Sequence, residues 1–582
     1  MSPAGRGHAG TRLRPPSPRW ESPDSLAPGD VRSLVDALQL PEAVCRVLLV
    51  RGFGHTEDAK RFLRPRMDQL SDPGLLADGV RAAGRIATAV QAGERIFVHG
   101  DYDVDGISAT ALLTRWLRAL GGVVTPFVPN RIRDGYDFSA NGLQAARDAG
   151  ASLVITVDCG TRAHDTVAAA GAAGLDVIIT DHHAVGDHLP PALAVVNPQR
   201  DDCRYPFKGL CGAGVAFRLG ELVGRELEAD LDTLHGMLDL VALATVADLV
   251  PLEGENRVLA AYGLHRIRTT PSQGLRALMR VADVSSDEVT SGRIGYQIAP
   301  RINAVGRMGE SADGLSLLLG DDASESARLA SLLDQANRER RDQEQRTLEE
   351  ALRTLEGQFD PDRDFGVVLA ADGWHPGVIG IVASRVVERI HRPVVIIALD
   401  GESGRGSARS VPGFDLYHAI AACHEHLTRF GGHRQAAGME LRRGVLEAFS
   451  AAFNAAVRAQ IEESLLTPIL RPDVDVELGE IDLQLMHWLS YLGPHGIGNP
   501  GPLFRARGVR FSNPRQVGTN HLKGELRTSG ASVDAIGFGL GDRFDPAELG
   551  VGMWDVLFRL DRNEWRGEVR VQARLADVRR AS

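Results

Sequence analysis

Lysine is nearly missing from this sequence of 582 residues. Its 65 basic residues include only Lys60, Lys208 and Lys523, so arginine supplies almost all of the positive charge. Cysteine is scarce as well, and no two cysteines form a Cys-x-x-Cys pair: the five are Cys45, Cys159, Cys203, Cys211 and Cys423. Their odd number and their spacing argue against a disulfide scaffold and a structural zinc site, and they are typical of a protein of the reducing cytoplasm.

Long apolar runs are missing too. No stretch approaches the roughly 18 consecutive apolar residues of a membrane-spanning helix, so we expect no contact with a membrane. The first residues lack the apolar core of a signal peptide, and six prolines fall within the first thirty positions. We therefore expect residues 1–40 to form a disordered tail. The length of the chain implies three or four folded units.

The charge balance gives an ambiguous signal. The formal net charge is −11, from 76 acidic and 65 basic residues, and a negative net charge argues against nucleic acid as a partner. The arginine excess has two explanations, a GC-rich coding bias or the use of arginine for bidentate phosphate contacts. Net charge does not decide between them, so the position of the arginines along the chain matters.

Short β-branched runs alternate with Ala- and Leu-rich runs between residues 80 and 200. Three of the apolar runs are IFVHGD (96–101), LVITVD (153–158) and DVIITDHH (176–183). This alternation predicts βαβ units and a parallel sheet. A long helix is predicted over 323–356, with a polar centre that is typical of a connector between two lobes. A second α/β pattern begins at residue 365.

The last eighty residues contain five short runs of alternating polarity, which predict a small OB-fold-like barrel. Residues 505–527 hold five arginines and one lysine against one acid, Glu525, a local charge of 6 − 1 = +5. We thus predict an α/β protein: a parallel-sheet lobe joined by a long helix to a smaller α/β lobe, followed by a C-terminal barrel. The predicted segments are 1–40, 41–270, 271–360, 361–462 and 463–582.

Acidic residues and histidines follow the predicted strands of the first lobe. HGDYDVDG (99–106) places His99, Asp101, Asp103 and Asp105 in a loop between a strand and a helix. Ligands of open α/β sheets bind at the carboxyl ends of strands, which is where this loop lies. Three closely spaced carboxylates repel one another unless cations lie between them.

Further candidate ligands occur at Asp158, in the Asp-His-His sequence at 181–183, and at Asp248, which ends an apolar helix. Carboxylates and imidazoles without a thiolate suit Mn²⁺ best, with Mg²⁺ as the alternative. There are more carboxylates than one ion requires, so we predict two ions that share an aspartate.

Four ordered motifs, HGDYDVDG, TVDCG, TDHH and VADLVPL, resemble those of the DHH phosphoesterase superfamily. GGHRQAAGM (431–439) resembles the motif of its DHH-associated domain. WHPGVIGIVASR (374–385), APRINAVGRM (299–308), GSARS (406–410) and LGPHGIGNPGPLF (492–504) are similar to those of its single-strand-specific 5′→3′ exonucleases. The resemblance covers residues 50–582 and identifies 41–270 as the catalytic domain, 361–462 as the DHH-associated domain and 463–582 as the nucleic-acid-binding domain.

The resemblance also implies a role for each site residue. One ion would be held by His99, Asp103 and Asp158. The second would be held by Asp105, Asp158, His182 and Asp248. Asp101 would support this cluster, and His183 would face the substrate phosphate. The implied DNA contacts are Arg301, Asn303, Arg307, Ser407 and Arg409, together with a phosphate grip formed by Gly431, Gly432 and His433.

The implied reaction is two-metal hydrolysis of the terminal phosphodiester of single-stranded DNA, which releases 5′-mononucleotides in repair and recombination. The implied partners are a single-strand-binding protein and a RecQ-type helicase, and we expect a monomer. Two rivals remain. A DHH phosphodiesterase for nanoRNA or cyclic dinucleotides usually ends soon after the GGH motif, whereas this chain continues for about 140 residues. A non-catalytic DHH-like protein that binds single-stranded DNA would lack metal ligands.

Overall fold

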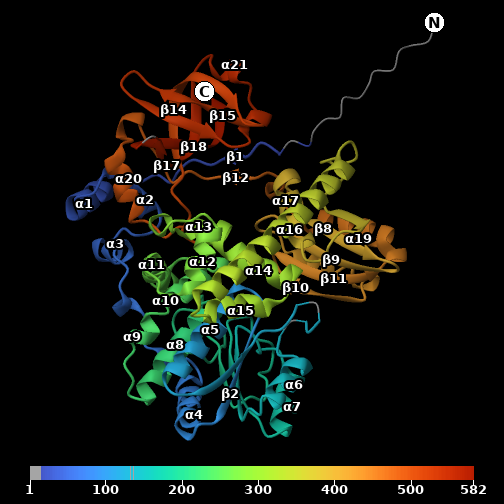
Figure 1. The fold of residues 1–582 in the computed structure, drawn as a ribbon. Helices are drawn as coiled ribbons and strands as arrows, with labels where there is room; N and C mark the ends of the chain where they lie inside the picture. Colours follow the sequence, from blue (N-terminus) through green and yellow to red (C-terminus); the bar gives the residue numbers. More distant parts are fainter. Residues whose placement is uncertain (1–12, 14, 132, 136, 566, 582) are drawn as a thin grey trace. The chain divides into compact units, whose positions relative to one another are not determined.

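The computed structural model of the chain describes residues 13, 15–131, 133–135, 137–565 and 567–581 (Figure 1). The chain divides into two compact units. Unit 1 consists of Met1–Gly54, Glu339–Trp488 and Pro502–Ser582, and unit 2 consists of His55–Arg338 and Leu489–Gly501. Within the described part of the chain, no helix combines the length and the apolar character needed to cross a membrane.

Unit 2 is built on a five-stranded parallel sheet, as predicted. The strands are β2 (Arg95–Gly100), β3 (Val123–Phe127), β4 (Leu153–Val157), β5 (Asp176–Thr180) and β6 (Ala194–Val196), in the order β3-β2-β4-β5-β6. The chain passes from β2 to β3 on one side and then returns to β4 on the other side of β2. The order of the strands therefore reverses between β2 and β4, which is the position where open α/β sheets bind ligands.

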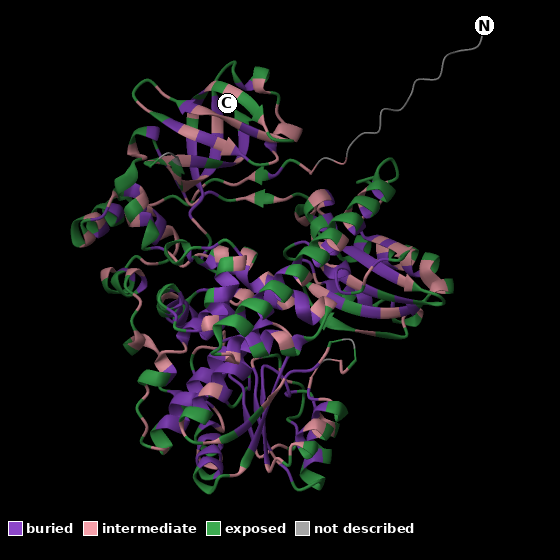
Figure 2. Ribbon diagram, viewed as in Figure 1, coloured by how far each residue is buried: buried purple, intermediate pink, exposed green. Residues whose placement is uncertain are grey.

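Helices cover both faces of this sheet. Ile96 and Val98 of β2 belong to the main core, whereas Phe97 between them belongs to a smaller core on the opposite face. Figure 2 shows most of this sheet in the colour of buried residues, and the edge strand β3 is its most exposed strand. The helices of the unit are α3 (Thr56–Leu63), α4 (Gly79–Ala92), α5 (Val104–Ala119), α6 (Ala140–Asp148), α7 (His164–Ala172), α8 (Gly212–Glu226), α9 (Asp232–His235), α10 (Leu238–Ala247), α11 (Gly254–Arg268), α12 (Gln273–Val281), α13 (Ser291–Arg293), α14 (Ala299–Met308) and α15 (Ser311–Leu319). A π-helix, Ile294–Ile298, leads directly into α14.

The predicted long helix is α16 (Ala323–Leu355), and the boundary between the two units falls within it. The α/β part of unit 1 follows. Its strands are β7 (Val367–Asp372), β8 (Val394–Asp400), β9 (Ser403–Arg409), β10 (Arg429–His433) and β11 (Ala436–Arg442), in the order β10-β11-β9-β8-β7. Its helices are α17 (Ile379–Ile390), α18 (Leu416–Ala421) and α19 (Leu446–Gln460).

The predicted C-terminal barrel is present. It consists of β14 (Phe504–Val517), β15 (His521–Arg527), β16 (Ser532–Gly537), β18 (Glu568–Arg580) and β17 (Trp554–Trp565), and pairing between β14 and β17 closes it. Leu526, Val556 and Phe558 are fully buried inside. The short strand β13 (Val474–Asp475) adds to β14, and α20 (Leu483–Ser490) and α21 (Pro546–Leu549) complete the region.

The expectation of a disordered tail over 1–40 is wrong for part of that range. Residues 1–12 and 14 lie outside the described residues, but β1 (Arg19–Trp20) pairs with β12 (Ile469–Leu470), and α1 (Pro28–Leu38) precedes α2 (Glu42–Val50). Proline content misled the prediction, because Pro28 occupies the first turn of α1, where a missing N–H costs nothing. Val31 and Leu34 lie on one face of α1 and are buried.

Candidate functional site

The predicted ligands lie at the ends of adjacent strands in unit 2. Asp101, Asp103 and Asp105 follow β2, Asp158 follows β4, and His182 follows β5. Because β2, β4 and β5 are neighbours and parallel, these side chains meet at one edge of the sheet. The point where the strand order reverses lies between the first two of these strands.

Helix N-termini hold two of the aspartates. The Oδ1 of Asp103 accepts hydrogen bonds from the N–H groups of Asp105 (3.0 Å) and Gly106 (3.1 Å), so Asp103 is the N-cap of α5. The carboxylate of Asp105 accepts from the first two N–H groups of α8, those of Gly212 (2.6 Å) and Ala213 (2.7 Å). Backbone donors at a helix start stabilise a buried negative charge.

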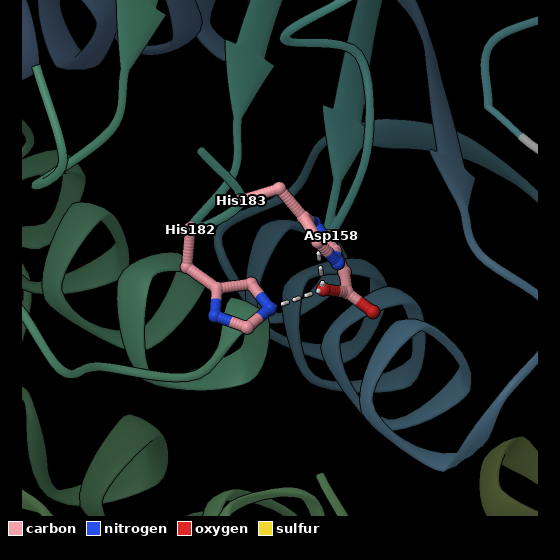
Figure 3. Close-up of side chains that lie close together, drawn as sticks. All are labelled: Asp158, His182 and His183. Atoms are coloured by element: carbon pink, nitrogen blue, oxygen red, sulfur yellow. Dashed lines mark ion pairs between the residues drawn. The ribbon is translucent and has the colours of Figure 1, made fainter. Parts of the chain in front are cut away.

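Asp158 lies at the centre of the cluster. It is almost fully buried, and its φ of 62° lies in the left-handed region, which is uncommon for aspartate. Its Oδ1 is 3.0 Å from the Nε2 of His182 (Figure 3). Gly212 lies behind it, and a Cβ at Gly212 would be only 2.5 Å from the Cβ of Asp158. Only glycine therefore fits at position 212.

Three groups of candidate metal ligands occur among the described residues, each with its ligand atoms within 4.8 Å of one another. They are Asp101, Asp103 and Asp158; Asp105, His182 and Asp248; and Asp158, His182 and His183. Asp158 belongs to two of the groups, as expected for an aspartate shared between ions. The Asp158 Oδ1 and the His182 Nε2 are buried without a hydrogen bond from any described residue. These unsatisfied oxygen and nitrogen atoms fit a divalent cation.

His99 stands apart from these three groups. Its ring is fully buried between Phe127 and Phe138, and its Nδ1 is 3.7 Å from the Sγ of Cys159. A Cβ at Gly142 would be 2.6 Å from its Nε2. The assignment of His99 as a ligand stays a prediction, and in this structure Asp101 takes the place beside Asp103 and Asp158.

The carboxylates destabilise one another. Burial, followed by repulsion from Asp105, raises the pKa of Asp158 well above its usual range. Burial and repulsion from Asp103 raise the pKa of Asp105 to about 7, and burial and repulsion from Asp105 raise the pKa of Asp248 to about 9. Each cation that binds here replaces repulsion by attraction, so the cluster favours divalent ions strongly.

The two histidines differ in environment. The side chain of His182 is only 12% exposed, and desolvation followed by the charge of His183 lowers its pKa to about 4, so its ring is neutral and suited to a metal. The side chain of His183 is 43% exposed, and its Nδ1 bonds to the Oδ1 of Asp181 at 2.7 Å. Burial alone would lower the pKa of His183, but the bond and the charge of Asp181 raise it to about 9. His183 is therefore positively charged at neutral pH.

Asp181 belongs to the predicted Asp-His-His motif, but the sequence analysis assigned it no role of its own. Besides His183, its carboxylate accepts from the N–H groups of His182 (2.7 Å) and Thr161 (3.0 Å), so it fixes the loop after β5. Its place in the Asp-His-His motif was the available signal. The role of Gly212 gave no such signal, because the contact with Asp158 joins segments more than fifty residues apart.

The three predicted DNA contacts of α14, Arg301, Asn303 and Arg307, differ in burial and in bonding partners. The Oδ1 of Asn303 accepts from the N–H of Val104 at 3.2 Å, so Asn303 positions the start of α5 beside Asp103. Arg301 is buried, and its guanidinium bonds to Asp334 and to the backbone oxygen of Gln297. These bonds favour a structural role for Arg301. Arg307 lies on the same helix, partly exposed, and its charge acts on Tyr102 of the β2–α5 loop.

Most of the predicted phosphate contacts of unit 1 share one face of its sheet. His433, Ala436 and Arg409 are paired across β10, β11 and β9, and Gly431, Gly438 and Ser407 form the adjacent row. The Nη1 of Arg409 donates to the Oγ of Ser407 at 3.0 Å. Gly432 has φ 147° and lies so close to the carbonyl of Ala436 that a Cβ there would be 2.4 Å from its oxygen.

Three family models match the chain. The DHH family N-terminal domain matches residues 95–245, the DHHA1 domain matches 364–459, and the RecJ OB domain matches 472–577. These ranges lie within the segments predicted as 41–270, 361–462 and 463–582.

The chain is similar to the single-stranded-DNA-specific exonuclease RecJ of Bacillus subtilis, with 35% identity over 96% of this chain and 70% of that protein. Its fold matches the crystal structure of RecJ from Thermus thermophilus in complex with Mn²⁺, with a TM-score of 0.83 and 32% identity over 97% of this chain and 80% of that chain. The structure of the same protein with Mg²⁺ matches with a TM-score of 0.78 and 31% identity over 97% of this chain and 79% of that chain.

Proposed function

The chain belongs to the RecJ family of single-stranded-DNA-specific exonucleases, and we propose that it removes mononucleotides from the 5′ end of single-stranded DNA. It is a metal-dependent hydrolase of phosphodiester bonds. The observation that carries this function is the buried cluster around Asp158, whose unsatisfied oxygen and nitrogen atoms fit divalent cations. The full-length similarity to exonucleases favours this function over a dinucleotide phosphodiesterase or a non-catalytic DNA-binding protein.

Two sets of residues would hold the ions. Asp101, Asp103 and Asp158 form one set, to which the resemblance adds His99, whose buried Nε2 lacks a hydrogen bond from any described residue. Asp105, His182 and Asp248 form the other set, and Asp158 would be shared with it, because its Oδ1 is 3.0 Å from the Nε2 of His182. Mn²⁺ is the preferred ion and Mg²⁺ the alternative. When bound, such a pair supplies a water of lowered pKa and a clamp for the phosphoryl oxygens.

The charged His183 would contact the phosphate directly. Its ring lies beside Asp158, with 4.0 Å between Nδ1 and the Oδ1 of Asp158, and it is more exposed than His182. Asp181 holds the Nδ1, so the orientation of the ring is fixed before substrate binds. A positive group that is already in place stabilises negative charge as it develops on the phosphoryl oxygens, without a cost of reorganisation.

A row of cations crosses the outside of the barrel and would follow the DNA backbone. Arg515, Lys523, Ile536, Arg574 and Arg559 are paired in register across β14, β15, β16, β18 and β17. Leu522, Ala535 and Ala573, which are adjacent to three of these residues in sequence, are buried, so the row itself points outward. Ile536 separates the pair Arg515 and Lys523 from the pair Arg574 and Arg559, and Arg574 also forms an ion pair with Asp561 (3.0 Å). Cations on one face of a small barrel match the charged groove of proteins that bind single strands.

The sheet of unit 1 would supply a second set of phosphate contacts. Ser407, Arg409 and His433 share a face with Gly431, where the absence of side chains leaves the backbone open to an anion. A Cβ at Gly380 of α17 would be 2.8 Å from the Nη2 of Arg409, so Gly380 leaves room for that guanidinium.

A single-strand-binding protein and a RecQ-type helicase stay our expected protein partners, and we propose a monomer. All five cysteines are free and buried. Together with the absence of Cys-x-x-Cys pairs, they support a reducing compartment such as the cytoplasm.

Digestion of end-labelled oligonucleotides tests the function. With Mn²⁺, a 5′-labelled single strand should release its label as a mononucleotide at once, whereas a 3′-labelled strand should shorten gradually. A blunt duplex should resist, and Asp158→Asn should be inactive. Attack from the 3′ end, equal digestion of the duplex, or full activity of Asp158→Asn would each contradict the proposal.

A further inference from the structure

An apolar patch lies beside the metal centre in unit 2. Tyr296 is 80% exposed, Leu249 is 66% exposed and Ile497 is 53% exposed, and all three belong to the most exposed large apolar side chains among the described residues. Leu249 directly follows Asp248, one of the candidate metal ligands. Exposed apolar groups cost free energy in water, so a cluster of them at such a place indicates a binding surface.

The backbone holds each of these side chains outward. Leu249 has a φ of 59°, a left-handed conformation that is strained for leucine. Tyr296 lies in the π-helix, whose Ile294 and Ile298 are packed in the same core as Val246 of α10. A π-helical turn is rare and occurs mainly at functional sites, because it changes the direction of a side chain at a cost in regular hydrogen bonding.

The third residue is presented by a loop that is firmly anchored within the same unit. The carbonyl oxygen of Ile497 accepts from the N–H of Leu252 at 2.7 Å, and the Nδ2 of the buried Asn499 donates to the carbonyl oxygens of Leu492 and Pro494, both at 2.8 Å. Gly498 lies so close to Glu253 that a Cβ there would be 2.8 Å from its Oε1.

The segments that carry Tyr296 and Ile497 both contact the stretch 246–252, which contains Leu249. Gly295, next to Tyr296, lies against Val246, with 3.7 Å between the position of a Cβ there and the Cγ1 of Val246. Val246 lies at the end of α10, three residues before Leu249, and Leu252, whose N–H donates to the carbonyl oxygen of Ile497, lies three residues after it. The three exposed residues thus belong to segments that adjoin the stretch carrying Asp248. We call Leu249, Tyr296 and Ile497 the apolar platform.

We propose that the apolar platform binds one unpaired base of the substrate, in a nucleotide that flanks the phosphate held at the metal centre, with Tyr296 stacked on the base. This inference rests on the proposed function. A base is joined to its phosphate only through the sugar, so a base must lie close to the centre when a phosphate binds there. The flat face of every base is apolar, and stacking on tyrosine is tolerant of sequence. A base that is paired in a duplex is not free to reach the platform.

Substrates that lack one base give the direct test. We would measure kcat and KM for single strands with an abasic site at the first or the second nucleotide, using the wild-type chain, Tyr296→Ala and Tyr296→Phe. For the normal strand, Tyr296→Ala should raise KM by roughly tenfold with kcat little changed, and Tyr296→Phe should behave as wild type. One of the two abasic strands should raise the KM of the wild type equally, and Tyr296→Ala should raise it no further.

Controls separate this inference from a structural effect and from the function itself. Tyr262→Ala, at a partly exposed tyrosine of α11, should leave KM unchanged for every strand. An equal loss by Tyr296→Ala on normal and both abasic strands, or no loss at all, would overturn the platform. Failure of the wild type to digest the normal single strand would instead overturn the proposed function.

Discussion

Asp158 follows β4 with its backbone in the left-handed region and its carboxylate among other acidic groups. Asp158→Asn keeps the size of the side chain and removes one charge from the centre. We expect activity to fall by about a thousandfold or more, because the shared ligand of the two proposed ions is lost. Without metal, the variant should be more stable than wild type, because the burial of charge and the repulsion that raise the pKa of Asp158 disappear.

Thermal unfolding in a chelator and single-turnover digestion with Mn²⁺ measure the two effects of Asp158→Asn. Asp165→Asn, at an exposed position of α7, is the matched control and should change neither. A variant that is inactive but also less stable without metal would show that Asp158 holds the fold and would argue against charge repulsion at the centre.

The close packing of Gly212 against Asp158 gives a second prediction about the metal centre. Gly212→Ala places a methyl group where only 2.5 Å separate it from the Cβ of Asp158, so either α8 or the loop after β4 must move. We expect a loss of activity of about a hundredfold or more and a weaker stabilisation by Mn²⁺, since misplaced ligands bind metal poorly. Gly171→Ala is the control, because nothing lies within 4 Å of a Cβ there, near the C-terminal end of α7, and this change should stabilise slightly. Equal behaviour of the two variants would contradict the crowding at Gly212.

The sequence predicted those site residues whose chemistry is local. Asp158 and His182 could be found because each follows a β-branched run, and parallel strands bring such positions together. Asp181 could be found only as part of its motif. Its hydrogen bond to the Nδ1 of His183 depends on the orientation of the two side chains, which the sequence does not give. Arg301 had the expected residue type but pairs with Asp334 of α16, a partner that no local pattern indicates.

Elements formed by neighbouring residues were predicted better than contacts between distant ones. The five barrel strands follow from alternation, yet closure of the barrel through β14 and β17 joins segments about fifty residues apart. The helix α1 was missed because its stability comes from burying Val31 and Leu34, and composition alone reports only the nearby prolines. The π-helix at Ile294–Ile298 had no sequence signal.

The cation row of the barrel yields a prediction at the level of a whole element. Lys523→Glu reverses one charge within the row formed by Arg515, Lys523, Arg574 and Arg559. We expect weaker binding of long single strands and a slope of log affinity against log salt concentration that is smaller by about 1. The metal centre uses other residues, so the kcat for a saturating single strand should be unchanged.

Filter binding at several salt concentrations measures this slope, with Arg276→Glu as the control. That arginine is an exposed residue of α12, and the substitution changes net charge by the same amount. If both variants reduce the slope equally, net charge and not the row governs binding.

For the whole molecule, the net charge of −11 concealed an uneven distribution. A part of the negative charge is buried at the end of the unit 2 sheet, where Asp101, Asp105 and Asp158 need cations. A part of the positive charge is aligned on the barrel of unit 1. Arginines also serve as structural partners, as Arg301 does, so the scarcity of lysine alone did not indicate a nucleic-acid partner.

This division into two units, each with its own core, predicts how the whole chain responds to metal. All candidate ligands lie in unit 2, so Mn²⁺ stabilises that unit alone. At a hundred times the dissociation constant, binding contributes about 2.7 kcal/mol, which should raise the melting temperature of unit 2 by about 4 °C. Calorimetry of the full chain should therefore show two transitions, of which Mn²⁺ moves one. In Asp158→Asn neither should move. A single transition that shifts as a whole would mean that the two units unfold cooperatively. Two transitions that Mn²⁺ does not move in the wild type would contradict metal binding at the centre.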